Sequence, residues 1–177
     1  MVNWIELRDK QNPSFSFIYS NTHWDHIGDT ARFESAKLMR AKITEVAGNE
    51  AVVFTGDFNA DQGGKAYQRM TGRDDADLVR NLTDTYRVIH PEDSATVGTA
   101  PGFDGKGGDG RIDWILHDSA FKTIDANIDH TNFDGHYPSD HSPINAVIRE
   151  LPEPSALTVV GLIAVPLLLS RPRARAR

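Results

Sequence analysis

The sequence predicts an α/β fold, with a mixed sheet and helices on one of its faces. The first observation is a strand–helix–strand unit: residues 15–19 are rich in β-forming side chains, a helix is expected from Asp29 or Thr30 to about Ala47, and an apolar run follows at 51–55. Such a unit implies two parallel strands joined by a right-handed crossover. The second observation is residues 111–116, whose alternating pattern predicts another strand.

The predicted helix has one apolar face and a clear end. Apolar residues recur along it at steps of three and four, and Gly48 and Asn49 follow it; the apolar positions are Phe33, Ala36, Met39, Ile43 and Val46. The run at 51–55 is almost continuously apolar, as expected of a strand that is buried on both faces. These two segments therefore form the centre of the predicted core.

The rest of the folded part is less regular. A short helix is expected near Lys65 to Met70, and residues 78–90 remain ambiguous between helix and strand. Residues 93–110 are dense in glycine and predict a long loop, which in a compact domain is often functional. Two further strands are expected at 121–128 and 144–148.

Composition limits the classes of function. The chain has 177 residues, enough for one domain with a core, and no cysteine, which excludes disulfides and thiolate metal sites. The net charge is −6, but the last seven residues hold four of the 19 basic side chains. Leaving out these arginines and Glu153 gives 15 basic and 24 acidic residues, a net charge of −9. Such a body binds polyphosphate poorly by charge alone, and divalent cations would offset part of that charge.

The chain divides into three parts. Residues 1–150 form the predicted domain, residues 151–155 (LPEPS) form a linker, and residues 156–177 form a hydrophobic anchor with a basic tail. The uncharged run at 156–170 predicts a hydrophobic C-terminal helix, although 15 residues is short against the roughly 17–25 of a spanning helix. With the arginines behind it, the run fits a membrane stop with its basic end inside. A buried C-terminal helix is the alternative, but the run has no polar face.

The stretch NTHWDHIG, residues 21–28, raises two possibilities. It resembles the H-x-H-x-D-H motif of the metallo-β-lactamase superfamily, which implies zinc bound by His23, Asp25 and His26, but Asn21 replaces the first histidine. Alternatively, a strand ends here and presents His23 alone to a phosphate. The downstream motifs favour the second possibility.

Three further segments carry side chains suited to phosphate chemistry. Asp57 and Asn59, in GDFN, follow the buried strand at the edge where α/β sheets hold ligands. Asp113 lies within the strand at 111–116, where a buried carboxylate needs a partner or a metal. In SDHSP, Asp140 offers the oxygen that hard cations prefer and His141 is a candidate base. Each segment alone is also compatible with an ordinary turn or loop.

The four segments, in the order TH, GDFN, RIDWIL and SDHSPI, resemble the endonuclease/exonuclease/phosphatase superfamily, the DNase-I-like α/β sandwich, from about residue 15 to 148. The resemblance implies a phosphoesterase that uses Mg²⁺ or Mn²⁺. By that resemblance His23 contacts the scissile phosphate, Asp57 orients or deprotonates water and binds metal, and Asn59 holds the phosphate. Asp113 pairs with His141, and Asp140 binds metal. Either Asp57 or the Asp113–His141 pair could be the base.

The resemblance covers the C-terminal half of that fold. The family's main metal-ligand glutamate maps onto no residue here, because neither Glu6 nor Glu34 lies in the required strand-end context. We therefore expect weak or no activity from this chain alone. We also expect an exposed apolar sheet face, which an N-terminal half or a dimer partner would cover; its expected contributors are Phe15, Phe17, Val53, Trp114 and Leu116.

The C-terminal segment resembles the PEP-CTERM sorting signal, through the Pro-Glu-Pro-Ser at 152–155, the apolar run and the terminal arginines. The resemblance implies export in a Gram-negative bacterium, anchoring at the membrane or cell surface, and processing by an exosortase. Two alternatives to a phosphoesterase stay open: a non-catalytic exported half-domain, and a zinc hydrolase of the metallo-β-lactamase type.

Overall fold

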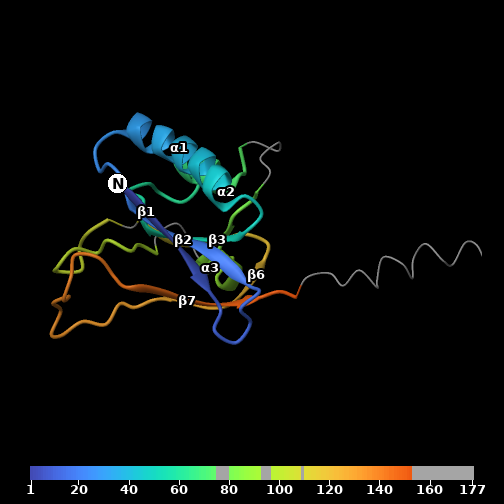
Figure 1. Ribbon diagram of the computed structural model, residues 1–177. Helices are drawn as coiled ribbons and strands as arrows, with labels where there is room; N and C mark the ends of the chain where they lie inside the picture. The colour runs from blue at the N-terminus through green and yellow to red at the C-terminus, as the bar shows by residue number, and fades with distance from the viewer. Residues whose placement is uncertain (75–79, 93–96, 109, 153–177) are drawn as a thin grey trace, which may run out of the picture.

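The computed structural model describes residues 1–74, 80–92, 97–108 and 110–152, which form two sheets and three helices (Figure 1). The main sheet has five strands in the order β1-β2-β3-β5-β4, and the second has β6 and β7. The strands are β1 (Val2–Arg8), β2 (Ser16–His23), β3 (Ala51–Asp57), β4 (Thr83–Asp84), β5 (Asp113–His117), β6 (Phe121–Ile128) and β7 (Ile144–Glu150). The helices are α1 (Asp29–Ala47), α2 (Lys65–Thr71) and α3 (Thr85–Ile89).

The predicted strand–helix–strand unit is confirmed as β2–α1–β3. Strands β2 and β3 are parallel neighbours, and α1 buries Ala36, Met39 and Ile43 of its predicted apolar face. The helix ends where Gly48 adopts a φ of 54°, a conformation that favours glycine. Strand β2 extends past the predicted Tyr19 to His23, so the histidine belongs to the strand itself.

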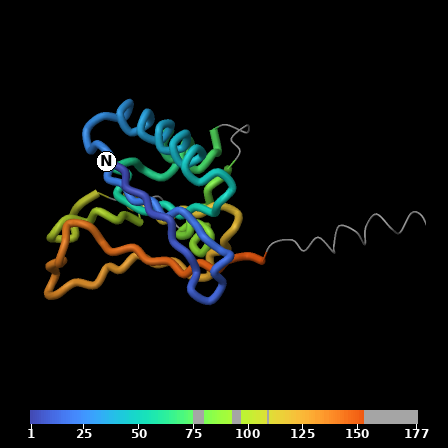
Figure 2. The backbone as a smooth tube through the Cα atoms, viewed as in Figure 1, coloured from blue at the N-terminus to red at the C-terminus, as the bar shows by residue number. Residues whose placement is uncertain are grey.

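Strand β1 was not expected from the sequence. It pairs antiparallel with β2 at the edge of the sheet, and six of its seven residues are exposed. Since neither face of the strand is buried, its side chains carry no alternating burial pattern. The carbonyl of Met1 accepts from the His23 amide at 3.4 Å, so the start of the strand lies beside the end of β2. Figure 2 marks this N-terminus.

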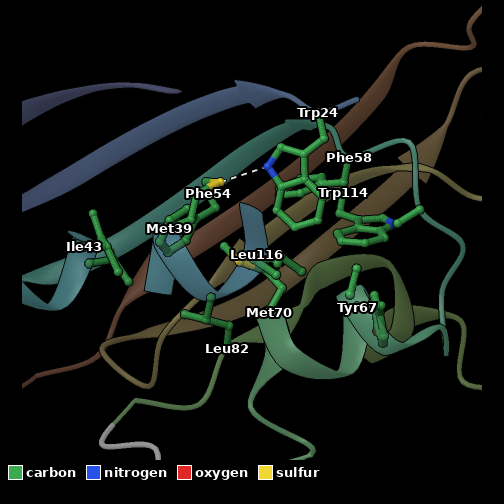
Figure 3. Packing of buried hydrophobic residues seen from close by; sticks show 14 of the residues in the cluster. Trp24, Met39, Ile43, Phe54, Phe58, Tyr67, Met70, Leu82, Trp114 and Leu116 are labelled. Carbon is green, nitrogen blue, oxygen red and sulfur yellow. Dashed lines mark hydrogen bonds between the residues drawn. The ribbon is translucent and has the colours of Figure 1, made fainter. Parts of the chain in front are cut away.

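An aromatic core fills the space between the main sheet and the helices α1 and α2 (Figure 3). The Phe58 and Trp114 rings stack with centroids 4.4 Å apart, and Trp24 meets both edge-on. Trp114 and Leu116 are fully buried here, so the prediction that they line an exposed face was wrong. Their alternation in β5 points them toward the helices.

The opposite face of the main sheet is covered by β6 and β7. Phe121 of β6 meets Phe15 and Phe17 edge-on, with centroids 5.6 and 5.5 Å away. Val53 is 5% exposed, and Phe15 and Phe17 are partly buried in the same cluster. The expectation of one sheet with a bare apolar face was therefore wrong: the last two strands do not extend the main sheet but pack against it.

Two remaining predictions concern the connecting and terminal segments. The ambiguous segment at 78–90 contains, in its described part, the short β4 and α3. The hydrophobic helix expected at 156–170 lies outside the described residues. Within the described ranges, no helix combines the length and the apolar character needed to cross a bilayer.

Candidate active site

Three predicted site residues lie in one row across the main sheet. His23 is the register partner of Asp57, and Asp57 is the register partner of Asp113. His23 and Asp57 end the parallel strands β2 and β3, while Asp113 begins the antiparallel β5, so all three occupy the same edge. Residues directly opposite on neighbouring strands share a face and lie about 5 Å apart. The sheet register therefore gathers these side chains.

The backbone around Asp57 is shaped by two residues of the GDFN segment. A Cβ added to Gly56 would lie 2.1 Å from the Thr22 carbonyl oxygen, so only glycine lets β2 approach this closely. Asn59 adopts a left-handed φ of 48°, which asparagine tolerates better than most residues. The glycine and the asparagine are thus needed by the turn itself, in addition to any chemistry.

The Asp57 carboxylate is the acceptor at the centre of the site. Its Oδ1 accepts from the backbone amide of Asn59 at 2.8 Å, and its Oδ2 accepts from the side-chain Nδ2 of Asn59 at 3.3 Å. The His23 Nε2 lies 3.3 Å from the same Oδ2. The Asn59 Nδ2 also donates to the Trp24 carbonyl at 3.1 Å, which ties the turn to the end of β2. His23 is the open member of the group, with 71% of its side chain exposed.

His141 completes the site from a loop far along the chain. Its Nδ1 lies 2.8 Å from the Asp113 Oδ2, and its Nε2 lies 3.9 Å from the Asp57 Oδ2. A carboxylate bonded to one imidazole nitrogen sets the tautomer and leaves the other nitrogen free to exchange a proton. The predicted pairing of Asp113 with His141 is thus present in the structure.

Burial and charge shift both members of this pair. Burial raises the pKa of the Asp113 carboxyl, against hydrogen bonds from Thr99 and His141 that lower it. Burial by itself would lower the pKa of His141, but the hydrogen bond and charge of Asp113, with the charges of Asp57 and Asp140, outweigh it and raise that pKa. The imidazole is therefore held as a stronger base than an ordinary histidine.

The donor set suits a divalent cation bound partly by water. Among the residues that the structure describes, Asp57, Asp113 and His141 bring ligand atoms within 4.8 Å of one another. Because Asp113 and His141 are bonded to each other, the Asp57 oxygens are the acceptors most available to a metal. Magnesium is commonly held by one or two carboxylates and several waters, so the set fits that ion. The exposed Asp140 carboxylate lies outside this cluster, and its metal role stays a prediction.

The zinc interpretation of NTHWDHIG finds no support in the geometry. The Asp25 carboxylate accepts from the backbone amides of Ile27 and Gly28, which makes it a turn residue before α1. These bonds, chiefly the one from Gly28, lower the pKa of Asp25. In the described part of the chain, His23, Asp25 and His26 form no ligand cluster. Of these three residues, His23 is the one that lies beside Asp57, and its contact with a phosphate stays a prediction.

Sequence reasoning missed two features of the site. Thr99, in the glycine-rich segment, bonds to the backbone at Asp113, and no spacing signal marks a single threonine there. A hollow of about 560 Å³ opens beside Asn59, lined among others by Arg32, Phe33 and Lys65. These residues come from α1 and from the start of α2, and only folding brings them next to the GDFN turn.

The fold and site define a two-sheet α/β protein with a carboxylate–histidine centre at the strand ends. A profile of the endonuclease/exonuclease/phosphatase family matches residues 2–141, and the chain belongs to that family. No curated protein matches the sequence significantly.

Solved structures resemble the chain over most of its length. The mannosyl-6-phosphatase Bt3783 of Bacteroides thetaiotaomicron is 27% identical, with 84% of this chain and 56% of that chain covered and a TM-score of 0.69. A family member from Bacteroides vulgatus is 25% identical, with 85% and 55% covered and a TM-score of 0.67. TDP2 of D. rerio, in complex with a single-strand DNA product, is 18% identical, with 84% and 62% covered and a TM-score of 0.61, and shows the fold alone. The chain thus spans somewhat over half the length of these structures.

Proposed function

We propose that this chain carries the hydrolytic centre of a phosphoesterase that uses Mg²⁺ or Mn²⁺ and an in-line water. The observation that carries the proposal is the convergence of four predicted residues: His23, Asp57 and Asp113 share one row of the sheet, and His141 bonds to Asp113 at 2.8 Å. Membership of a phosphatase and nuclease family supports it.

The geometry favours His141 as the general base. Asp57 is the proposed metal ligand, and its carboxylate also contacts Asn59 and His23, so it is less suited than His141 to accept a proton. The His141 Nε2 lies 3.9 Å from the Asp57 Oδ2, beyond hydrogen-bonding distance, while the Nδ1 is hydrogen-bonded to Asp113. A base with a pKa near neutrality is the most effective, and the partner carboxylate brings an imidazole into that range. His23, the exposed member, is placed to donate to a phosphoryl oxygen.

A bound metal would supply charge neutralisation at the phosphate and lower the pKa of a bound water. Asp57 would hold it, with Asp140 as a second carboxylate. Because only these two carboxylates among the described residues are proposed to hold the ion, we expect low magnesium affinity and low turnover from this chain alone. A non-catalytic half-domain is the second candidate, and the sparse donor set favours it. Neither Glu6, paired with Arg8, nor Glu34, paired with Lys37, supplies the missing oxygen.

We further propose that the substrate is a phosphate ester whose organic group occupies the hollow beside Asn59. At about 560 Å³ this hollow suits a small ligand. Lys65 supplies a donor and Phe33 supplies an aromatic surface, whereas the Arg32 guanidinium already donates to the Asp25 carbonyl and pairs with Asp29. The sugar-phosphate activity named for the Bacteroides thetaiotaomicron relative is consistent with such a substrate.

The test is hydrolysis of p-nitrophenyl phosphate and bis-p-nitrophenyl phosphate by the purified chain, with Mg²⁺, with Mn²⁺, and with EDTA. We expect slow, metal-dependent turnover that EDTA abolishes. His23→Ala should reduce the rate far more than the matched control His26→Ala, which removes an exposed imidazole three residues away. Equal loss in both variants, or turnover indifferent to EDTA, would contradict the proposal.

Two partner proposals concern exposed apolar residues of the sheets and the C-terminal segment. We propose that additional family strands, supplied by a longer polypeptide or a second copy, cover apolar residues left exposed on the two sheets, such as Ile5 and Val147, each 55% exposed. Light scattering of the purified chain should then show association through these faces, and Ile5→Lys should weaken it. A strictly monomeric chain at high concentration would oppose the idea.

We also propose that residues 152–177 direct export, anchor the chain at the membrane, and are processed by an exosortase. The Pro-Glu-Pro-Ser sequence, the apolar run and the arginines support this. Fractionation of a Gram-negative host, with epitope tags at each end, would follow the C-terminal tag. An intact C-terminus in the cytoplasmic fraction would overturn the proposal.

A further inference from the structure

One buried residue next to the candidate active site has no role so far. Thr99 is fully buried, in the glycine-rich segment that precedes β5. Its amide donates to the Gly110 carbonyl at 3.2 Å, and its carbonyl accepts from the Ser142 amide at 2.8 Å. Thr99 therefore joins the approach to β5 to the loop that carries His141, two segments far apart in the sequence.

The same loop is tied at a second point. The Gly102 amide donates to the Asp140 carbonyl at 3.0 Å, beside His141. Two backbone bonds thus hold residues 99–102 along the 140–142 segment. This pairing helps to set the position of the His141 backbone, together with the Ser139 hydroxyl, which accepts from the His141 amide at 3.1 Å.

The Thr99 side chain is directed at Asp113. Its Oγ1 accepts from the Ile112 amide at 3.0 Å and from the Asp113 amide at 3.1 Å. The two accepted bonds use both lone pairs of the hydroxyl oxygen. One oxygen therefore holds the backbone at Ile112 and at Asp113, where β5 begins.

We infer that Thr99 is a positioning residue, whose hydroxyl holds the backbone at Asp113 so that the Asp113 carboxylate lies where it accepts from the His141 Nδ1. The role rests on the proposed function of the Asp113–His141 pair. Without the hydroxyl, the backbone amides of Ile112 and Asp113 lose their acceptor, and the start of β5 can shift relative to the loop that carries His141. Threonine suits the task because a β-branched side chain has few χ1 states, and burial leaves it one.

The test compares Thr99→Val, which keeps the shape and removes the hydroxyl, with Thr99→Ser, which keeps the hydroxyl and removes the methyl. The readout is the His141 Nδ1–H signal in proton–nitrogen NMR spectra of the full chain, which needs no substrate. We expect Thr99→Val to shift this signal and to speed its exchange with water about tenfold, the equivalent of one neutral hydrogen bond. Thr99→Ser should keep the native signal.

A double-mutant comparison with Asp113→Asn is the second part of the test. If Thr99 acts through Asp113, adding Thr99→Val to Asp113→Asn changes the His141 signal little further. Should Thr99→Val fail to fold, the serine variant still decides: a folded Thr99→Ser protein that has lost the native signal overturns the inference. A native signal in folded Thr99→Val also overturns it. Absence of turnover in the wild-type chain would count against the proposed function and leave this result untouched.

Discussion

Replacing Asp113 by Asn is the sharpest test of the candidate site, because it changes one oxygen and keeps the shape. The Asp113 Oδ2 lies 2.8 Å from the His141 Nδ1, and the exposed fractions of the two side chains are 15% and 33%. A hydrogen bond to a charged group contributes about 1.5–3 kcal/mol. At about 1.4 kcal/mol for each factor of ten, its loss lowers kcat/KM about 10- to 150-fold. The amide can also present the wrong donor and select the wrong tautomer.

The assay is the initial rate of phosphate-ester hydrolysis with magnesium, together with an NMR titration of His141. Because the bond and charge of Asp113 help to raise the pKa of His141, the variant should titrate at lower pH than the wild type. Glu34→Gln is the matched control, an exposed carboxylate on α1 that pairs only with Lys37 among the described contacts. Unchanged rates and an unchanged His141 titration in Asp113→Asn would refute the reasoning.

Three further predictions follow. If His141 is the base, its raised pKa keeps the imidazole protonated to higher pH, so kcat/KM should rise through a midpoint above 6.5 and be lost below it; a flat pH–rate profile would exclude this role. Gly56→Ala should destabilise the fold by about 1–3 kcal/mol in urea unfolding, because its Cβ would meet the Thr22 carbonyl at 2.1 Å, and a neutral effect would contradict that contact. Leu116→Ala should lower the free energy of unfolding by about 2–5 kcal/mol, since the side chain is fully buried under the helices. A change near zero would contradict the burial of this side chain.

Local chemistry made much of the main sheet predictable. The apolar run of β3 and the three-and-four spacing of α1 can be read from the local sequence, because the buried face of each segment is made of apolar residues. Strand β1 was not predicted, because an exposed edge strand has no burial pattern. The short β4 and α3 were not predicted, because such brief elements depend on contacts with their neighbours. The separation of β6 and β7 into a second sheet was not predicted either, since no local sequence signal distinguishes a strand that packs on a sheet from one that extends it.

The amino-acid sequence identifies the candidate site residues, because His23, Asp57, Asn59, Asp113 and His141 all stand in motifs that a family resemblance marks. How these residues meet depends on the fold. The register of β2, β3 and β5 places three of them in a row, and the Thr99 contacts bring the loop of His141 to Asp113. The physical reason is that a motif specifies side-chain types within a few residues, whereas a site depends on contacts between segments far apart in the chain.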